Sequence, residues 1–120
     1  MRSTNGFTFG GYAAAAWNNA NAPIAAAGSF VFWVENPQGR APGCLDCVKP
    51  AQALYSGRNS TWGPYFHGGG SSLYLCYSND PASSCAQPTA GYPDTTGLGV
   101  ALFTGAEQFT TEDYEVWAAT

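Results

Sequence analysis

Glycine and proline are spread along the whole sequence, and they limit what this chain can fold into. The 120 residues include 15 glycines and 8 prolines. Both residue types are unfavourable inside helices, so they interrupt any long helical period. The one alanine run, residues 13–16, is too short to form a stable helix alone and predicts a single turn at most. Extended helices are therefore not expected.

Short apolar runs between these breakers are typical of β-strands. The candidate strands are residues 7–9, 30–34, 53–55, 73–77, 100–103 and 113–117. The run Phe-Val-Phe-Trp-Val at 30–34 is continuous, which favours a central strand covered on both faces. Residues 36–50 and 78–97 are polar and rich in proline and glycine, and they are predicted to be loops. The pattern predicts an all-β fold, an antiparallel two-sheet β-sandwich with at most short helical turns.

The charge composition excludes several classes of partner. Only four residues are basic and eight are acidic, for a net charge of −4. Nucleic-acid binding depends on several contacts between basic residues and phosphates, so no nucleic acid is expected as a partner. No apolar run is long enough for a membrane span, and the first residues do not resemble a signal peptide. We expect a cytoplasmic monomer without membrane insertion, with secretion as the alternative.

Four cysteines leave three chemical states open. Cys44 and Cys47 form a C-x2-C pair, whereas Cys76 and Cys85 are separated by eight residues. The first pair is half of a usual zinc pattern and the second is not. Disulfides would form only in an oxidising compartment, and the spacing does not select a pairing. Reduced thiols are the favoured interpretation, so no cofactor is expected.

Catalytic motifs are not evident. His67 is the sole histidine, and neither Ser71 nor Ser72 lies in a nucleophile elbow. The glycines at 68–70 precede a predicted strand instead of a helix, so they do not resemble a phosphate-binding loop. No spacing selects a pair of carboxylates. We therefore predict that the chain is not an enzyme, and we assign no catalytic residue.

A glycan-binding role is the alternative. Trp62, Tyr65 and Phe66 occur in one predicted loop, where they could stack on a sugar ring or pack into the core. Asn59 begins a glycosylation sequon, which has meaning only in a secreted protein. Together with the cysteines, these residues are the basis of the alternative prediction, a secreted, disulfide-stapled glycan-binding β-sandwich.

Four segments in order resemble the TLDc domain. Phe-Gly-Gly-Tyr at 9–12, followed by Trp17, resembles the F-G-G-Y-T-S-x-x-W opening of that family. Ser-Phe-Val-Phe at 29–32 is similar to its A-F-L-F-S-L. The segment 63–75 resembles its G-P-x-F-G-x-G-x-D-L-x-I, and 102–117 resembles its closing L-x-G-x-x-x-F and E-V-W. The resemblance covers residues 9 to 117.

The resemblance implies a function as well as a fold. It implies a two-sheet β-sandwich in a non-enzymatic protein-interaction module. TLDc proteins are linked to oxidation resistance, protection from oxidative stress, and regulation of the vacuolar proton-pumping ATPase (V-ATPase). The implied partners are therefore peripheral V-ATPase subunits. The family carries over no catalytic residue.

The two ends of the chain carry the remaining expectations. TLDc domains have a helix and a strand ahead of F-G-G-Y, and only eight residues precede Phe9 here. We therefore expect a single TLDc-like domain over residues 1–120 that lacks this helix and strand, with an unpaired sheet edge where the strand is missing. Acidic residues gather near the end of the sequence. The predicted partner surface is Glu112, Asp113, Glu115 and Trp117.

Overall fold

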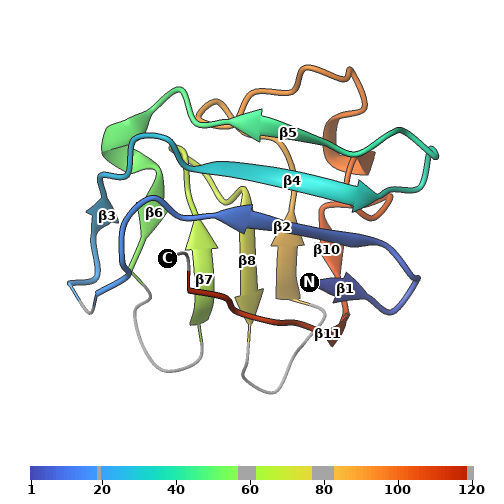
Figure 1. Cartoon of the computed structure of the whole chain (residues 1–120), viewed down its shortest axis with the longest axis horizontal. Helices are drawn as coiled ribbons and strands as arrows, with labels where there is room; N and C mark the ends of the chain where they lie inside the picture. The colour runs from blue at the N-terminus through green and yellow to red at the C-terminus, as the bar shows by residue number, and fades with distance from the viewer. Residues whose placement is uncertain (19, 57–61, 77–82, 119–120) are drawn as a thin grey trace.

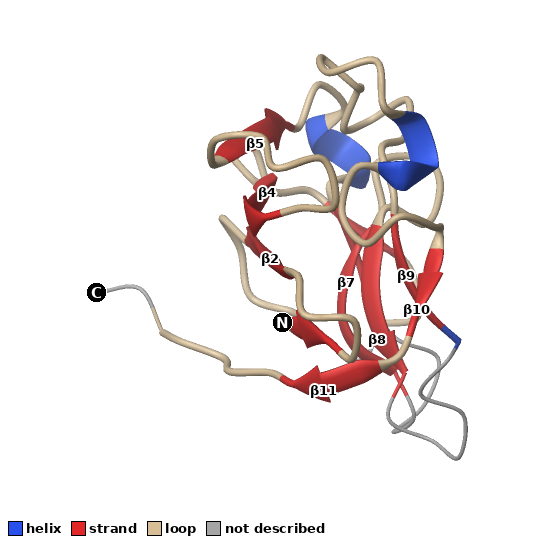
Figure 2. Ribbon diagram, turned by 90° about the vertical axis from the view of Figure 1, so that its right-hand side faces the viewer, coloured by secondary structure: helices blue, strands red, loops and turns tan. Residues whose placement is uncertain are grey.

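The protein folds into two antiparallel β-sheets that pack face to face (Figures 1 and 2). The computed structural model describes residues 1–18, 20–56, 62–76 and 83–118, with Trp62 and Cys76 described by their backbone only. The helical elements that lie wholly within these residues are the short 3₁₀ turns Pro50–Gln52 and Gly99–Ala101. The predicted all-β sandwich with short helical turns is confirmed.

The first sheet contains both ends of the described chain. Its strands lie in the order β11-β1-β2-β4-β5, and every neighbouring pair is antiparallel. The bounds are β11 Thr111–Asp113, β1 Arg2–Ser3, β2 Thr8–Tyr12, β4 Phe30–Glu35 and β5 Gly43–Asp46. β1 is much shorter than β2, so it accompanies only the beginning of that strand.

The second sheet is built from the middle of the chain and β10. Its order is β10-β9-β8-β7-β6-β3, again with antiparallel neighbours. The bounds are β3 Pro23–Ile24, β6 Leu54–Tyr55, β7 Trp62–Phe66, β8 Leu73–Cys76, β9 Ser84–Ala86 and β10 Gln108–Phe109.

The core lies between the sheets and is rich in aromatic residues. Phe9 of the first sheet packs edge-on against Phe109 of the second, with ring centres 4.9 Å apart, and also contacts Phe103. Phe66 of β7 lies beneath β2 and is 2% exposed. Burial of such large apolar side chains is the main favourable contribution to folding.

Several strand predictions differ from the structure. The run 100–103 is a 3₁₀ turn followed by buried Leu102 and Phe103, because Gly99 has a left-handed φ of +56° that a strand does not accommodate. The predicted loop 36–50 contains β5, and the predicted loop 78–97 contains β9. Both strands are short and are held by pairing with longer neighbours, an effect that local composition does not reveal.

β4 is central, but only one of its faces is fully covered. Val31 and Trp33 face the core, whereas Phe30 and Phe32 are half-buried and Val34 is 45% exposed. The ring of Phe30 stacks on that of Tyr12, with centres 5.3 Å apart. The expectation that both faces are covered is therefore wrong: neighbouring aromatic rings shield the outer face only in part.

The alanine run does not form a helical turn. Ala13 and Ala15 pack against the core, while Ala14 and Ala16 are exposed. This alternation is that of an extended segment. The predicted single turn is wrong, because burying every second residue against the sandwich outweighs a weak local helix preference.

Asp94 organises the loop that leads into the second 3₁₀ turn. Its carboxylate accepts hydrogen bonds from the backbone N–H groups of Thr96, Gly97 and Gly99 and from the Thr96 hydroxyl, at 2.6–3.2 Å. Desolvation raises the pKa of Asp94, but these hydrogen bonds outweigh it, so the pKa lies below its usual value. The charged form is thus favoured in the folded protein.

Asp94→Asn should lower stability at neutral pH but not in acid. The pKa of Asp94 is lower in the folded than in the unfolded protein. The carboxylate therefore stabilises the fold at pH values above its unfolded-state pKa of about 3.9. That contribution is lost as the pH falls through the pKa of Asp94 in the folded protein. Water screens this partly exposed group, so we expect the carboxylate to contribute at most about 1 kcal/mol to the free energy of unfolding at pH 7. Urea unfolding of both proteins between pH 7 and 3 measures the difference, and a constant difference across that range would contradict the assignment.

Candidate protein-binding groove

The predicted partner surface lies partly on β11 and partly on the segment after it. Glu112 and Asp113 belong to β11, whereas Glu115 and Trp117 lie in residues 114–118, here called the C-terminal segment. The predicted strand 113–117 is thus wrong after Asp113. β1 pairs with β11 only through Arg2 and Ser3, so the backbone beyond Asp113 has no strand beside it.

The C-terminal segment exposes large apolar side chains. Tyr114 is 42% exposed, Val116 69% and Trp117 83%. The indole N–H of Trp117 donates to a Glu115 carboxylate oxygen at 3.1 Å. In Figure 2 the segment leaves the body of the sandwich after β11. The sequence prediction therefore located exposed residues, but their backbone is not that of a strand.

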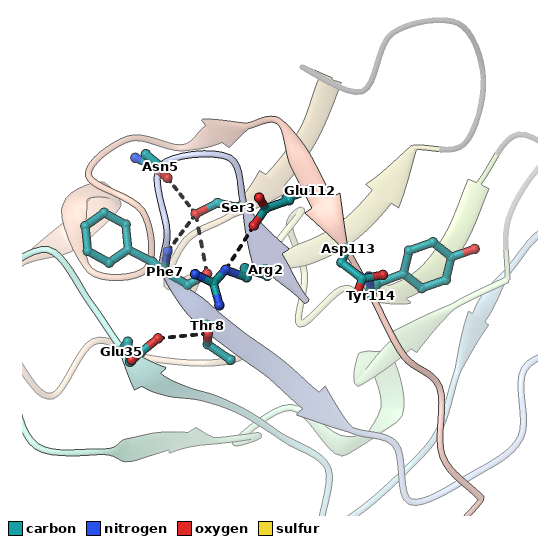
Figure 3. Close-up of polar contacts among 9 residues, drawn as sticks. All are labelled: Arg2, Ser3, Asn5, Phe7, Thr8, Glu35, Glu112, Asp113 and Tyr114. Carbon is teal, nitrogen blue, oxygen red and sulfur yellow. Dashed lines mark hydrogen bonds and ion pairs between the residues drawn. The ribbon is translucent and has the colours of Figure 1, made fainter.

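Polar contacts hold the N-terminal hairpin in place (Figure 3). Arg2 forms an ion pair with Glu112, Nε to Oε2, at 2.9 Å. The Ser3 hydroxyl donates to the side-chain oxygen of Asn5 at 2.6 Å and accepts from the N–H of Phe7 at 3.2 Å. The Asn5 amide donates to the Thr104 carbonyl. These bonds fix β1 between β11 and β2.

The hydrogen bonds between β1 and β2 end at Met1. Met1 and Phe9 exchange two bonds, from the Phe9 N–H to the Met1 carbonyl (3.0 Å) and from the Met1 amino group to the Phe9 carbonyl (2.8 Å). Groups that point to one side of a strand recur every second residue, so Gly11 is the next residue of β2 to face this side. β2 runs on to Tyr12 with β4 on its other side, and on this side no strand of the described chain pairs with it beyond Phe9.

A groove of about 1090 Å³ occupies the space between β2 and the C-terminal segment. Figure 1 shows the two backbone segments that border it, β2 and the residues that follow β11. Trp17, Pro64 and Phe66 contribute apolar surface to it. It is lined by residues 1–2, 8–17 and 113–118 together with Phe30, Phe32, Pro64 and Phe66. The groove is therefore a mostly apolar cleft bordered by a strand edge.

Both signs of charge line the groove: Arg2 and the Met1 amino group are basic, and Asp113 and Glu115 are acidic. Of the charged residues that line it, Arg2 is paired with Glu112. Asp113 and Glu115 form no close ion pair within the described ranges, but the Met1 amino group attracts both carboxylates. Burial lowers the pKa of the Met1 amino group, and both carboxylates act in the opposite direction.

The aromatic trio predicted to bind sugar is not displayed together. Trp62, Tyr65 and Phe66 belong to strand β7, not to a loop, and Tyr65 and Phe66 point to opposite faces. Phe66 is in the core, and the Trp62 side chain lies outside the described residues. Tyr65 instead shares its face with Tyr55 and His67, whose rings are 5.2–5.7 Å apart.

The residues considered for catalysis are each held by structural contacts. The Ser71 hydroxyl is hydrogen-bonded to that of Tyr65 at 2.5 Å, and Ser72 donates to the Gln87 carbonyl at 2.7 Å. His67 packs on Tyr55 and Tyr65, and burial lowers its pKa. Both serines thus use their hydroxyls in structural bonds, and no new site residue is suggested by them.

Three of the four cysteines are free thiols. Cys44 is exposed on β5, Cys47 follows that strand, and Cys85 is buried on β9 of the other sheet. The Cys76 side chain and Asn59 lie outside the described residues. Among the described histidine, cysteine, aspartate and glutamate side chains, no group of three is arranged to hold a metal ion.

Thiol reactivity should follow this burial. Burial raises the pKa of Cys85 to about 12, so at pH 8 this thiol is protonated and unreactive. We expect iodoacetamide to modify Cys44 rapidly in the folded protein and Cys85 only after unfolding, as peptide mass spectrometry would show. Four thiols titrated in denaturant would also remove the disulfide-stapled glycan-binding alternative. Fast modification of folded Cys85 would contradict the assignment.

The chain was compared with protein families, curated proteins and solved structures. No protein-family model matches the chain, and neither does any curated protein or solved structure. None of the helical elements in the described ranges has the length and hydrophobicity to cross a membrane. The groove itself was not anticipated as a site. Its position depends on the register at Met1 and Phe9, which residue types alone do not reveal.

Proposed function

We propose that this chain is a non-enzymatic, TLDc-like protein-binding module. The observation that carries the proposal is the C-terminal segment, which holds exposed Tyr114, Val116 and Trp117 beside an apolar groove. Contiguous exposed apolar surface rimmed by polar groups marks interaction sites in soluble proteins. Tryptophan and tyrosine are also the residues that most often dominate binding energy.

The proposed partners are peripheral subunits of the V-ATPase. This choice rests on the resemblance of residues 9–117 to TLDc domains, and with it come a cytoplasmic location and a role in protection from oxidative stress. The net charge of −4 supports a partner whose contact surface is basic.

A pull-down with matched variants tests this function. The full chain would be immobilised and exposed to purified peripheral V-ATPase subcomplex. We expect capture by the native chain and at least a ~10-fold loss in the double variant V116A/W117A, because it removes central apolar contacts. The double variant V48A/V100A is the control, since Val48 and Val100 are also exposed, at 58% and 50%, but lie elsewhere. No capture, or equal loss in both variants, would overturn the proposal.

A further inference from the structure

Asn5 and Gly6 lie in the turn between β1 and β2, and together they form a site of spontaneous modification. We propose that Asn5 deamidates when this turn opens, and that the product keeps β1 from returning to its place between β11 and β2. The sequence contains no other Asn-Gly pair. The inference is independent of the proposed partner, because the chain supplies both reacting groups.

The reaction is an intramolecular substitution. The backbone nitrogen of Gly6 forms a bond to the side-chain carbon Cγ of Asn5, the bond from Cγ to Nδ2 breaks, and ammonia leaves with the proton of the Gly6 nitrogen. Water then opens the five-membered imide at either of its carbonyl carbons and gives aspartate or isoaspartate. No electrons are transferred. Glycine favours the attack because it has no side chain to hinder its own nitrogen, and Asn5 is exposed to water.

The folded turn holds both reacting groups in other bonds. The Gly6 N–H donates to the Ser3 carbonyl at 2.9 Å. The Asn5 amide donates to the Thr104 carbonyl at 3.0 Å, and its oxygen accepts from the Ser3 hydroxyl at 2.6 Å (Figure 3). Ring closure must turn the Asn5 side chain toward the Gly6 nitrogen, which breaks the bond to Thr104. The turn is therefore unreactive while β1 is in place.

Few contacts hold β1, so its local opening requires less free energy than global unfolding. It pairs with β11 through Arg2 and Ser3, and its paired residue on the β2 side is Arg2, opposite Thr8. The Arg2 and Glu112 side chains of the ion pair are 56% and 54% exposed, and exposed pairs of this kind contribute little to stability. Opening of β1 is thus the step that exposes Asn5 and Gly6 to reaction.

The product lacks the contact that ties the turn to the rest of the sandwich. Aspartate and isoaspartate have no side-chain N–H to donate to the Thr104 carbonyl, and Thr104 is only 5% exposed. Loss of the donor to a largely buried carbonyl is destabilising. Isoaspartate also adds one carbon to the backbone between Ser3 and Phe7, whose hydrogen bond of 3.0 Å closes the turn. Deamidation therefore favours the state in which β1 is released.

Peptide mass spectrometry of the full chain at mildly alkaline pH measures the reaction at Asn5. We expect the folded chain to react at least ~10-fold more slowly than the chain in urea. Ser3→Ala removes a hydroxyl that holds the turn and should accelerate the folded chain ~5-fold. The control Ser72→Ala loses a buried hydroxyl bond in the other sheet and should react at the native rate.

Two results would overturn the gating by β1. One is an equal rate in the folded and the urea-treated chain. The other is a reaction of Ser3→Ala no faster than that of Ser72→Ala, because the Ser3 hydroxyl would then not protect the turn.

Hydrogen–deuterium exchange tests the effect of the product on β1. Asn5→Asp should make the Phe9 N–H, which donates to the Met1 carbonyl, exchange at least ~10-fold faster than in the native chain. The control Asn18→Asp adds the same charge at another exposed position and should leave this exchange unchanged. The Ala86 N–H of the second sheet should keep its native rate in both variants. Equal Phe9 exchange in the two variants, or faster Ala86 exchange in Asn5→Asp, would overturn the local release of β1.

Discussion

Gly91→Ala should lower the free energy of unfolding by about 3 kcal/mol or more, at the upper end of overpacking effects. A Cβ on Gly91 would overlap the backbone of Gly68, meeting its Cα, carbonyl carbon and oxygen. Both glycines are buried. Because the obstacle is backbone and not a flexible side chain, it cannot move aside without displacing two loops.

The hydrogen bonds around this crossing explain why displacement is costly. The Gly91 carbonyl accepts from the Val48 N–H at 2.8 Å, and the Gly68 N–H donates to the Gln52 carbonyl at 2.7 Å. The adjacent Tyr92 is fully buried, and its hydroxyl donates to the Ala53 carbonyl at 2.6 Å. Separating the two glycine backbones would strain these three bonds together.

Gly39→Ala is the matched control for this substitution. Gly39 has a left-handed φ of +65° but no atom within 4 Å of an added Cβ. Gly39→Ala should therefore lower the free energy of unfolding by about 1–2 kcal/mol, for conformational reasons only. Gly91 has no such φ, so its cost is steric. Urea unfolding monitored by tryptophan fluorescence compares the two variants. A Gly91→Ala loss equal to or smaller than that of Gly39→Ala would contradict the close approach.

The fold class was predictable because apolar alternation reports directly on which residues face a core. The patterns at residues 7–9, 30–34, 53–55 and 73–77 each overlap a strand of the structure, with residue 77 outside the described residues. β5 was missed because Leu45 is its only large apolar residue, and its pairing with β4 decides its conformation. Pairing between distant segments is not visible in local sequence.

The candidate site was predictable only in part, for a related reason. Glu112, Asp113, Glu115 and Trp117 are exposed beside the groove, as an acidic and aromatic cluster near a strand end suggests. The groove, however, depends on where β1 stops pairing with β2 and β11. A register is a relation between strands, so residue types alone do not define it.

Phe66→Ala should lower the free energy of unfolding by about 3–5 kcal/mol, the range for removing a buried aromatic side chain. Phe66 is 2% exposed and packs edge-on against the rings of Trp17 and Tyr92, while Gly11 of the other sheet lies over it. Its removal leaves a cavity that rigid backbone on the Gly11 side does not readily fill. With a total stability of roughly 5–15 kcal/mol for a domain, much of the margin would be lost.

Urea unfolding of Phe66→Ala beside Phe7→Ala separates burial from residue type, since Phe7 is only half-buried. A loss for Phe66→Ala no larger than that for Phe7→Ala would contradict its place in the core.

The coupling of Phe66 to Gly11 has its own measurement. Gly11→Ala forces a methyl group against the Phe66 ring, and Phe66→Leu shortens that side chain, so the double variant should be more stable than the two separate losses predict. Strict additivity would mean that the Phe66 ring does not lie under Gly11.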